Sequence, residues 1–269
     1  MPWWSLKDSD NSRNKSSFAP ELGKKQDQQG EQRNGLFGVQ LDHFSDLRNL
    51  TAVGVLSSIC ISSYAFYVAY LRRVPQASQV RQSSWRKRSV FGVVTRVGDG
   101  DNFHLYHTPG GRALGWGWLR QVPKDPKALK DRTVHVRLAG VDAPETAHFG
   151  RPAQPWGKEA LDWLSAYLMH RRVRAYLHKK DQYDRAVATV YVRRGLLRKN
   201  VGLEMIRSGL ATVYEAKSGA EFGRFEQKYR KAESWAKARG KGMWRDKGGS
   251  LESPRDFKRR MGETAREDA

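Results

Sequence analysis

The longest apolar run in the chain extends from Leu50 to Leu71, 22 residues without a charge. As a helix this run would be about 33 Å long, enough to cross a hydrocarbon core of about 30 Å. Arg48 precedes it, and Arg72 and Arg73 follow it. We therefore predict a single-pass transmembrane helix over residues 50–71. Five Ser or Thr residues weaken its apolarity, so a helix buried in a globular domain is the alternative.

The segment before this run does not resemble a secretory signal. Residues 1–49 contain seven basic and seven acidic residues, whereas a signal peptide begins with a short basic stretch. The acidic content also differs from an acid-poor transit peptide, so this segment carries no organelle address. Residues 72–97 hold seven basic residues and no acid, which favours a cytoplasmic or matrix-like location for the C-terminal part. The same stretch could instead bind anionic lipid or nucleic acid.

Beyond residue 90 the apolar residues follow the shorter periods of strands and amphipathic helices. Runs rich in β-branched and aromatic residues predict five strands: Val90–Val97, Asn102–His107, Thr133–Leu138, Val173–Leu177 and Val187–Val192. Helical spacing predicts three helices: Trp156–Met169, Lys199–Ser208, and a third that begins at a Ser218/Glu221 capping box and ends at Gly240. This number of strands and helices indicates one α+β domain.

The other segments differ from this domain in composition. Residues 1–49 are polar and expected to be disordered, and residues 72–89 form a basic linker. The domain spans residues 90–246, and residues 247–269 form a charged tail that we expect to be disordered or a solvated helix. Within the domain, residues 108–131 are rich in Gly and Trp and predict an exposed excursion. Its tryptophans could stack on bases or touch a membrane, but a self-packed surface loop is favoured.

Charge and cysteine content narrow the choice of partner and metal. The formal charge is +21, all of it within residues 50–269, because the first 49 residues sum to zero. Such a surface favours a polyanion, either nucleic acid or an anionic bilayer, and a merely solvated surface is the alternative. The single cysteine, Cys60, excludes an intramolecular disulfide and a cysteine-based zinc site. The seven histidines show no metal-binding spacing, and we assign them no role.

Three short segments carry residues that point to chemistry. The first (residues 97–102, VGDGDN) flanks acids with glycines at a strand boundary, where a turn can present a carboxylate. The second (residues 136–145, VRLAGVDAPE) leads from a strand arginine through a glycine to two acids beside a proline. The third (residues 181–187, DQYDRAV) places an arginine at the start of another strand.

In this order the three segments resemble the staphylococcal-nuclease-like (thermonuclease) family. Its pattern has Asp-Gly-Asp, then Arg-Leu-x-Gly-x-Asp-x-Pro-Glu, then Asp-x-Tyr-x-Arg. The similarity continues through Gly209-Leu210-Ala211 to Gly242-Met243-Trp244, and covers about residues 90–246. The resemblance implies a five-stranded OB-type β-barrel with three helices, in agreement with the number of strands and helices that periodicity predicts.

The resemblance also implies a calcium site. Asp101 and Asp142 correspond to the family's calcium-binding acids, and the backbone carbonyl of Ala143 corresponds to a further ligand. Two carboxylates suit Ca²⁺, a hard cation with several oxygen ligands, and leave places for water and a phosphate oxygen. Asn102 stands where the family usually has Thr, a departure that could alter calcium affinity.

The implied catalytic groups are a base and two arginines. Glu145 corresponds to the family's general base, and Arg137 and Arg185 to its catalytic arginines. A glutamate can take a proton from the attacking water, and guanidinium groups match the equatorial oxygens of the transition state. Tyr183 corresponds to a tyrosine near the substrate base and could stack on it.

We therefore expect a membrane-anchored, calcium-dependent endonuclease that hydrolyses DNA, RNA or both. The spanning helix together with this domain resembles the fungal, membrane-anchored probable endonucleases, which are assigned to mitochondria. The alternative is a catalytically inactive OB-type module, tethered to a membrane, that binds nucleic acid or another molecule. A tether whose basic surface only docks on lipid is a third possibility, and no obligate protein partner is inferred. The arginines and acids could also serve only to neutralise one another.

Overall fold

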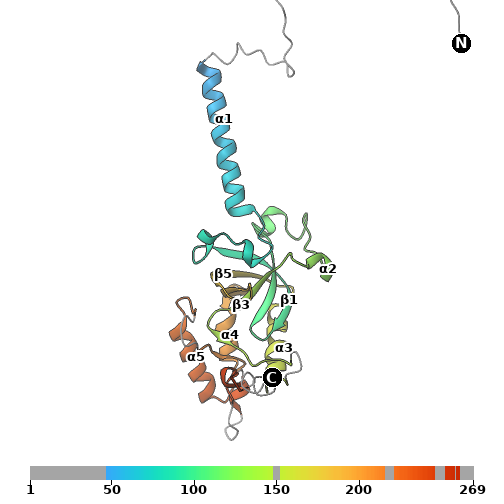
Figure 1. Ribbon diagram of the computed structural model, residues 1–269, viewed down its shortest axis with the longest axis vertical. Helices are drawn as coiled ribbons and strands as arrows, with labels where there is room; N and C mark the ends of the chain where they lie inside the picture. The colour runs from blue at the N-terminus through green and yellow to red at the C-terminus, as the bar shows by residue number, and fades with distance from the viewer. Residues whose placement is uncertain (1–46, 148–151, 216–220, 246–251, 258, 261–269) are drawn as a thin grey trace, which may run out of the picture. The chain divides into compact units, whose positions relative to one another are not determined.

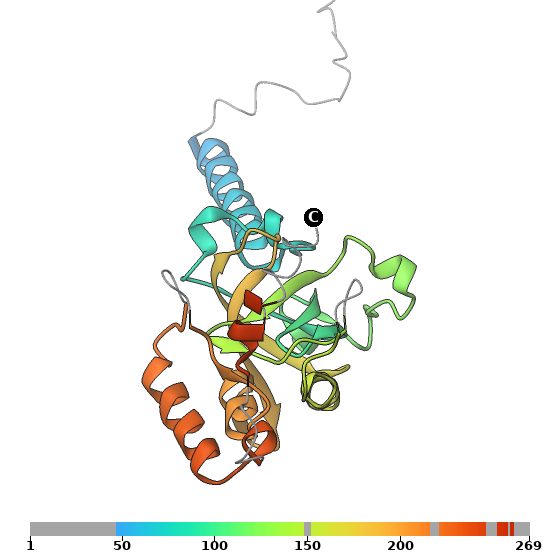
Figure 2. The same cartoon turned by 60° about the horizontal axis from the view of Figure 1, so that its bottom comes forward.

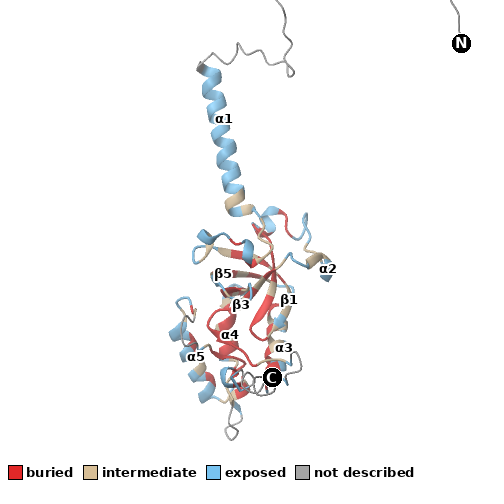
Figure 3. Ribbon diagram, viewed as in Figure 1, coloured by how far each residue is buried: buried red, intermediate tan, exposed pale blue. Residues whose placement is uncertain are grey.

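The computed structural model describes residues 47–147, 152–215, 221–245, 252–257 and 259–260 (Figure 1). The chain divides into two compact units, residues 1–57 and 58–269. The first described element is α1 (Leu47–Phe66), which continues as a π-helical segment, Tyr67–Leu71. Large apolar side chains along this helix are exposed, and Figure 3 colours most of the helix as exposed. By length and composition, Arg48–Leu71 is the one helix in the described part of the chain that could cross a membrane.

The domain is built around a strand-rich sheet. The strands are β1 (Ser89–Asp99), β2 (Asn102–His107), β3 (Val134–Leu138), β4 (Val141–Asp142), β5 (Arg172–Lys180), β6 (Ala186–Arg194), β7 (Leu197–Asn200) and β8 (Thr212–Val213). Six of them form one sheet in the order β3-β2-β1-β5-β6-β7, and β4 pairs with β8 in a separate two-stranded sheet. The five predicted strands are all present, and β4, β7 and β8 were not predicted.

One further pairing links distant parts of this sheet. β3 also pairs with β6, in parallel, although the two strands are separated in the strand order by β2, β1 and β5. The mixed α+β class is confirmed. The sheet is not a plain five-stranded barrel, because β7 extends it beyond β6 and β4 and β8 lie apart from it.

The helices place their apolar faces against this sheet and against one another. α3 (Gly157–Leu168) packs on β1, and α4 (Val201–Arg207) packs on β6. α5 (Glu226–Ala238) packs on α4, and Figure 2 shows these two helices side by side. α3 buries Ala160, Leu164 and Leu168, which recur every four residues along one face. The buried residues, red in Figure 3, therefore form one core between the strands and these helices.

Two predicted helix starts were wrong. The second helix begins at Val201, because Lys199 and Asn200 belong to β7 and the Asn200 side chain accepts a hydrogen bond from the N–H of Leu203 as the N-cap. The third begins at Glu226, and Ser218 of the predicted capping box lies outside the described residues. Glu221 is not helical, because its carboxylate accepts a hydrogen bond from the N–H of Gly223 in a local turn.

Parts of the segments that flank the predicted domain pack on its core. Ala77 and Val80, from the predicted basic linker, are buried within the core cluster. From the predicted tail, Phe257 is also buried, so this part of the tail is not simply solvated. The predicted disorder of the N-terminal segment concerns residues 1–49, of which residues 1–46 lie outside the described chain.

The Gly- and Trp-rich excursion packs on itself. It contains a 3₁₀ turn, Gly111–Leu114, and the short helix α2 (Pro126–Leu129). The indole N–H of the buried Trp116 donates to the carbonyl of Pro109 at 3.0 Å, and that of Trp118 donates to Arg112 at 2.9 Å. These bonds close within the excursion, as expected for a self-packed surface loop.

Candidate active site

Strand pairing brings the first and second sequence segments together. β3 lies beside β2 with Asn102 opposite Arg137, so the turn that carries Asp101 lies next to the strand that carries the arginine. The N–H of Leu138 donates to the carbonyl of Asp101 at 2.9 Å and fixes this arrangement. The parallel pairing of β3 with β6 places Arg137 opposite Val187, two residues after Arg185. The three segments thus meet at one side of β3.

Arg137 forms the centre of an ion-pair cluster. Its Nη2 lies 2.9 Å from Oδ2 of Asp101 and 3.4 Å from Oδ1 of Asp142, and both aspartates are buried. Burial alone would lower the pKa of Arg137, but the two carboxylates outweigh it and raise the pKa. The guanidinium is therefore a fixed positive charge held between two acids.

Asp142 is positioned by the small β4–β8 sheet. Asp142 pairs with Thr212 across this sheet, and the Thr212 hydroxyl donates to the Asp142 carbonyl at 3.2 Å. The turn before β4 requires Gly140, whose φ is +70° and whose missing Cβ leaves room for the ring of Phe222. The glycine of the second segment therefore has a steric role: it lets the chain turn from β3 toward Asp142.

Glu145 lies on the loop that follows Asp142 and Ala143. The side chain of Gln154 holds this loop, because its Oε1 accepts from the N–H of Glu145 at 3.4 Å and its Nε2 donates to the carbonyl of Glu252 at 2.8 Å. The N–H of Gln154 donates in turn to the Glu145 carbonyl at 2.9 Å. Gly157 allows the close approach, since a Cβ there would collide with that same carbonyl oxygen. Glu145 is partly exposed, so its carboxylate is accessible to water.

Asp99 joins the acidic side of the site. Its Oδ1 accepts hydrogen bonds from the N–H of Gly100 at 2.8 Å and from the hydroxyl of Thr146 at 3.1 Å. Burial raises the pKa of Asp99, and the negative charges of Glu145 and Asp101 raise it further. Asp99 therefore lies within electrostatic reach of both Glu145 and Asp101.

Arg185 is held by an aspartate from its own turn. Asp181 accepts from Nε of Arg185 at 2.6 Å and from the backbone N–H groups of Tyr183 and Arg185 at 2.9 and 2.8 Å. Burial opposes ionisation of Asp181, but these hydrogen bonds and the guanidinium charge lower its pKa overall. Because Nε is engaged by Asp181, the terminal nitrogens of Arg185 can face elsewhere. Its guanidinium carbon also lies 5.0 Å from the centre of the Tyr183 ring.

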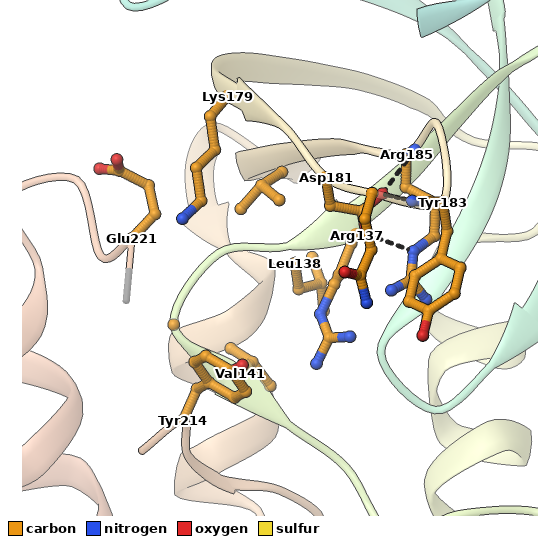
Figure 4. A pocket seen from close by; sticks show the side chains of 12 residues that line it. Arg137, Leu138, Val141, Lys179, Asp181, Tyr183, Arg185, Tyr214 and Glu221 are labelled. Carbon is orange, nitrogen blue, oxygen red and sulfur yellow. Dashed lines mark hydrogen bonds and ion pairs between the residues drawn. The ribbon is translucent and has the colours of Figure 1, made fainter. Parts of the chain in front are cut away.

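Arg137, Arg185 and Tyr183 line a common pocket of about 350 Å³. Figure 4 shows Arg137 pointing into the space between Tyr214 and Tyr183, with Arg185 beside Tyr183. The Tyr214 ring centre lies 5.3 Å from the Arg137 guanidinium carbon. Asp101, Asp142, Ala143 and Glu145 do not line this pocket; the two aspartates adjoin it through Arg137.

Sequence reasoning assigned no role to three residues that the structure brings to this site. Asp99 was visible in the first segment but was indistinguishable from an ordinary turn residue. Tyr214 comes from β8's C-terminal end, where its N–H donates to the Gly140 carbonyl at 3.1 Å. The ring of His135 contacts Asn102 at 3.0 Å, and Asn102 donates to Asp101 at 3.1 Å, so the histidine helps to orient a carboxylate. Burial lowers the pKa of His135 to about 4, which keeps its ring neutral near pH 7.

The carboxylates of Asp101 and Asp142 are the donors available to the calcium ion that the sequence implies. Within the described residues there is no group of three or more His, Cys, Asp or Glu side chains arranged to hold a metal. However, the side chains of Asp101 and Asp142 converge on one point, which a guanidinium nitrogen occupies. Both carboxylates contribute hard oxygen donors. The positively charged guanidinium of Arg137 already binds both of them at this point. The residues present therefore fit a divalent cation with water completing its coordination.

Comparison with known proteins identifies the family of this chain. Residues 135–246 match the family described as staphylococcal nuclease homologue. A protein of Botryotinia fuckeliana named Probable endonuclease lcl3 is 57% identical over 226 residues, which cover 83% of this chain and 86% of that protein. The Probable endonuclease LCL3 of Pyricularia oryzae is 55% identical, with 83% and 87% covered, and that of Aspergillus niger is 56% identical, with 81% and 84% covered. This chain belongs to the staphylococcal nuclease homologue family.

Proposed function

We propose that this protein is a membrane-anchored, calcium-dependent endonuclease that hydrolyses phosphodiester bonds of DNA, RNA or both. The observation that carries the proposal is the shared position of Arg137: it binds two buried aspartates on one side and lines a pocket with Arg185 on the other. Membership of a nuclease family, with relatives named as probable endonucleases, makes the protein a hydrolase. The extra pairing of β3 with β6 supports a closed OB-type barrel as its scaffold.

Asp101 and Asp142, with the carbonyl of Ala143, would hold the calcium ion. Proteins of this family are generally calcium-dependent, and the oxygen donors described above suit that ion. When bound, it would neutralise phosphate charge and polarise the phosphorus–oxygen bond. Arg137 already binds both carboxylates, so it would have to share them with the ion.

Glu145, Arg137 and Arg185 would perform the chemistry on the substrate. Glu145 accepts the proton of the attacking water, and its loop is held at the right place by Gln154. The two arginines donate hydrogen bonds to the phosphate oxygens as charge builds up in the transition state. Asp181 fixes Arg185 through Nε and leaves the outer nitrogens to face the phosphate.

The tyrosine rings that line the pocket would bind the nucleotides. Tyr183 is largely exposed, and Tyr214 lies on the opposite side of Arg137. Stacking on such rings tolerates every base, because each base has a π-face. This suits an enzyme with low sequence preference, whose contacts to phosphate and to base faces are the same at every step.

The exposed apolar helix would anchor the enzyme in a membrane. It is long enough to span, and the basic residues that follow it favour a matrix-like or cytoplasmic position for the nuclease domain. We propose that this membrane is mitochondrial because the spanning helix and the domain together resemble the fungal, membrane-anchored probable endonucleases. Release of the protein from mitochondrial membranes by alkaline carbonate would contradict a spanning helix.

The direct test is to assay the full-length chain in neutral detergent on circular single-stranded DNA. A circle has no ends, so linear products establish endonuclease action. We expect cleavage with Ca²⁺ and none after addition of a calcium chelator, with recovery when Ca²⁺ is restored in excess. Equal cleavage with and without chelator would overturn the calcium requirement. Tight binding of the DNA without cleavage in any divalent ion would favour an inactive binding module instead.

A further inference from the structure

A second cavity, of about 630 Å³, lies outside the catalytic pocket and shares none of its lining residues. Its wall includes Val68, Ala69 and Tyr70 from the last turn of the apolar helix, together with residues of the segment that leads into β1. Seven of its lining residues are Arg or Lys, and none is acidic. A cavity of this size and polarity is large enough for a phosphate group with a glycerol backbone.

Two arginines that line the cavity, Arg88 and Arg174, are bound by neutral groups of neighbouring segments. Arg88 donates to the carbonyl of Ala69, and its guanidinium lies 4.7 Å from the Tyr70 ring centre. Arg174 donates to the hydroxyl of Ser89 at 3.0 Å. Carbonyls, hydroxyls and rings orient a guanidinium but do not cancel its charge. The side chains are thus preorganised and still available to an anion.

Arg73 is a partly buried cation whose environment disfavours its charge. Its guanidinium stacks 3.8 Å from the Tyr106 ring centre and donates to the carbonyl of Arg132. Its Nε is buried, with no hydrogen-bond partner among the described residues. Burial lowers the pKa of Arg73, and the charge of Arg132 lowers it further. An anion in the cavity would relieve the repulsion.

The remaining cations face the cavity freely. Arg72, Arg81, Lys87 and Arg112 form no ion pair with any residue in the described part of the chain. By contrast, the catalytic arginines are each bound to aspartate. A cluster of unneutralised cations in a concave site is the arrangement expected for binding a phosphate-bearing ligand.

The position of the cavity distinguishes between sources of phosphate. The aromatic side chains of Tyr64, Tyr67 and Tyr70 are exposed along the C-terminal end of the apolar helix, at the level where such rings favour the membrane interface. The cavity begins at the same turn, and its wall includes apolar Val68, Val74 and Val80. Apolar and cationic groups side by side suit the junction of acyl chain and headgroup better than they suit a nucleic acid strand.

We propose that this cavity binds the phosphate of an anionic glycerophospholipid, with the glycerol and upper acyl chain against its apolar wall. The proposal rests on the membrane anchoring proposed above. The bound headgroup would fix the distance and orientation of the nuclease domain at the bilayer surface, which a flexible basic linker would not do. The lipid would thus be a structural ligand, separate from the substrate.

The test is to titrate the full-length chain in neutral detergent with dihexanoyl phosphatidylglycerol and to measure binding by isothermal titration calorimetry. The variant Arg81→Gln/Lys87→Gln removes two exposed cations that line the cavity. The control Arg198→Gln/Lys231→Gln removes two exposed cations that do not line it. We expect the dissociation constant to rise about thirtyfold in the cavity variant and less than twofold in the control. Equal weakening in both variants would overturn the proposal.

Two parallel titrations identify the ligand. Inorganic phosphate and dihexanoyl phosphatidylcholine should each bind the unmodified protein at least tenfold more weakly than phosphatidylglycerol. Equal binding of inorganic phosphate would show that only the phosphate matters and would overturn the lipid assignment. The cavity variant should cleave a short oligonucleotide at the normal rate, and a raised KM for it would identify the cavity as a nucleic acid track instead.

The two proposals can fail separately. The titration needs no bilayer, so binding can be measured even if carbonate extraction releases the protein and overturns the anchor. Loss of the anchor with intact, cavity-dependent lipid binding would leave a peripheral lipid site. An intact anchor with no cavity-dependent binding would overturn the lipid site alone.

Discussion

Two cavities in this domain are lined by arginines, and they differ in what faces those arginines. In the pocket that we propose to be catalytic, Arg137 lies between Asp101 and Asp142, and Arg185 is bound by Asp181. No acidic residue of the described chain lines the cavity beside the apolar helix, and its arginines contact neutral carbonyls, hydroxyls and rings. The catalytic pocket is therefore electrostatically balanced before substrate arrives, whereas the second cavity is not.

The difference matches two tasks that both involve phosphate. A catalyst gains from binding the transition state more tightly than the ground state, so strong unbalanced attraction for phosphate would only lower KM. Acids beside the arginines weaken the attraction of the guanidinium groups for phosphate and fix their orientation. A structural ligand site has no such constraint, and unbalanced charge there contributes directly to affinity. The comparison can be tested by changing one cavity and measuring both.

The largest effect is expected from Glu145→Gln, which removes the proposed base without changing its size. We expect kcat to fall about 10³-fold, within the range that a general base contributes, with KM changed less than threefold. Single-turnover cleavage of an oligonucleotide measures this. Binding of phosphatidylglycerol should be unchanged, since Glu145 does not line the second cavity.

The matched control is Glu159→Gln, which removes an exposed glutamate from the first turn of α3 and should leave kcat within twofold. Normal cleavage by Glu145→Gln would remove this residue from the mechanism. The acids around Glu145 would then have a purely structural explanation.

A smaller loss is expected from Arg185→Lys, which keeps the positive charge but loses the planar fork. Nε of Arg185 holds Asp181 while the outer nitrogens remain for phosphate, and lysine cannot do both. We expect kcat to fall about 10²-fold, the usual cost of one transition-state donor. Arg198→Lys, on the exposed part of β7, serves as the control. If Arg185→Lys changed KM alone, the arginine would bind the ground state and the distinction between the cavities would disappear.

Gly157→Ala tests whether the position of the catalytic loop matters. The added Cβ would collide with the carbonyl of Glu145, so the loop or the start of α3 must move. A displacement of the order of 1 Å can reduce kcat about tenfold or more. Ser165→Ala, on the same helix, is the control. A melting temperature recorded for each variant separates lost stability from lost positioning, and an unchanged kcat would show that the loop tolerates displacement.

Local sequence was sufficient for much of the fold and for the chemical types at the site. Alternating and β-branched runs predicted β1, β2, β3, β5 and β6, because burial on one or both faces sets the residue types in such strands. The start of α5 was mispredicted because Ser218 and Glu221 have capping-box spacing but Glu221 is used in a turn. Spacing identifies residues that can cap, but the competing hydrogen bond is visible only in three dimensions.

The convergence of the site could not be derived from any one segment. Arg137 and Arg185 approach through the parallel pairing of β3 with β6, strands separated by more than 40 residues of chain. Only the resemblance to a known family placed them together in advance. Tyr214 had no motif around it, and it reaches Arg137 because β8 pairs with β4 and its own N–H binds Gly140. Long-range pairing of this kind leaves no signal in local periodicity.

The smallest effect concerns His107, which lines the second cavity and accepts a hydrogen bond from the N–H of Val74 at 2.9 Å. Burial lowers its pKa to about 4, and the charge of Arg73 contributes. The folded-state pKa lies below the ordinary value of 6.5. The neutral ring therefore contributes its full share of the unfolding free energy above pH 6.5. This contribution is lost as the pH falls from 6.5 toward 4. A protonated ring would add one more charge to a cavity without acids.

His107→Asn keeps an acceptor for Val74 but cannot be protonated, so it should reduce the acid-induced loss of unfolding free energy by about 2 kcal/mol between pH 7 and pH 5. Urea titrations of the full-length chain in detergent measure this, with the exposed His170→Asn as control. Saturating phosphatidylglycerol should stabilise the unmodified protein more at pH 5 than at pH 7, because the bound anion offsets the charge gained by His107. The catalytic pocket already contains its own acids, so no corresponding lipid effect on kcat is expected. If the pH dependence were the same in His107→Asn and the unmodified protein, protonation of the buried His107 would not be coupled to unfolding.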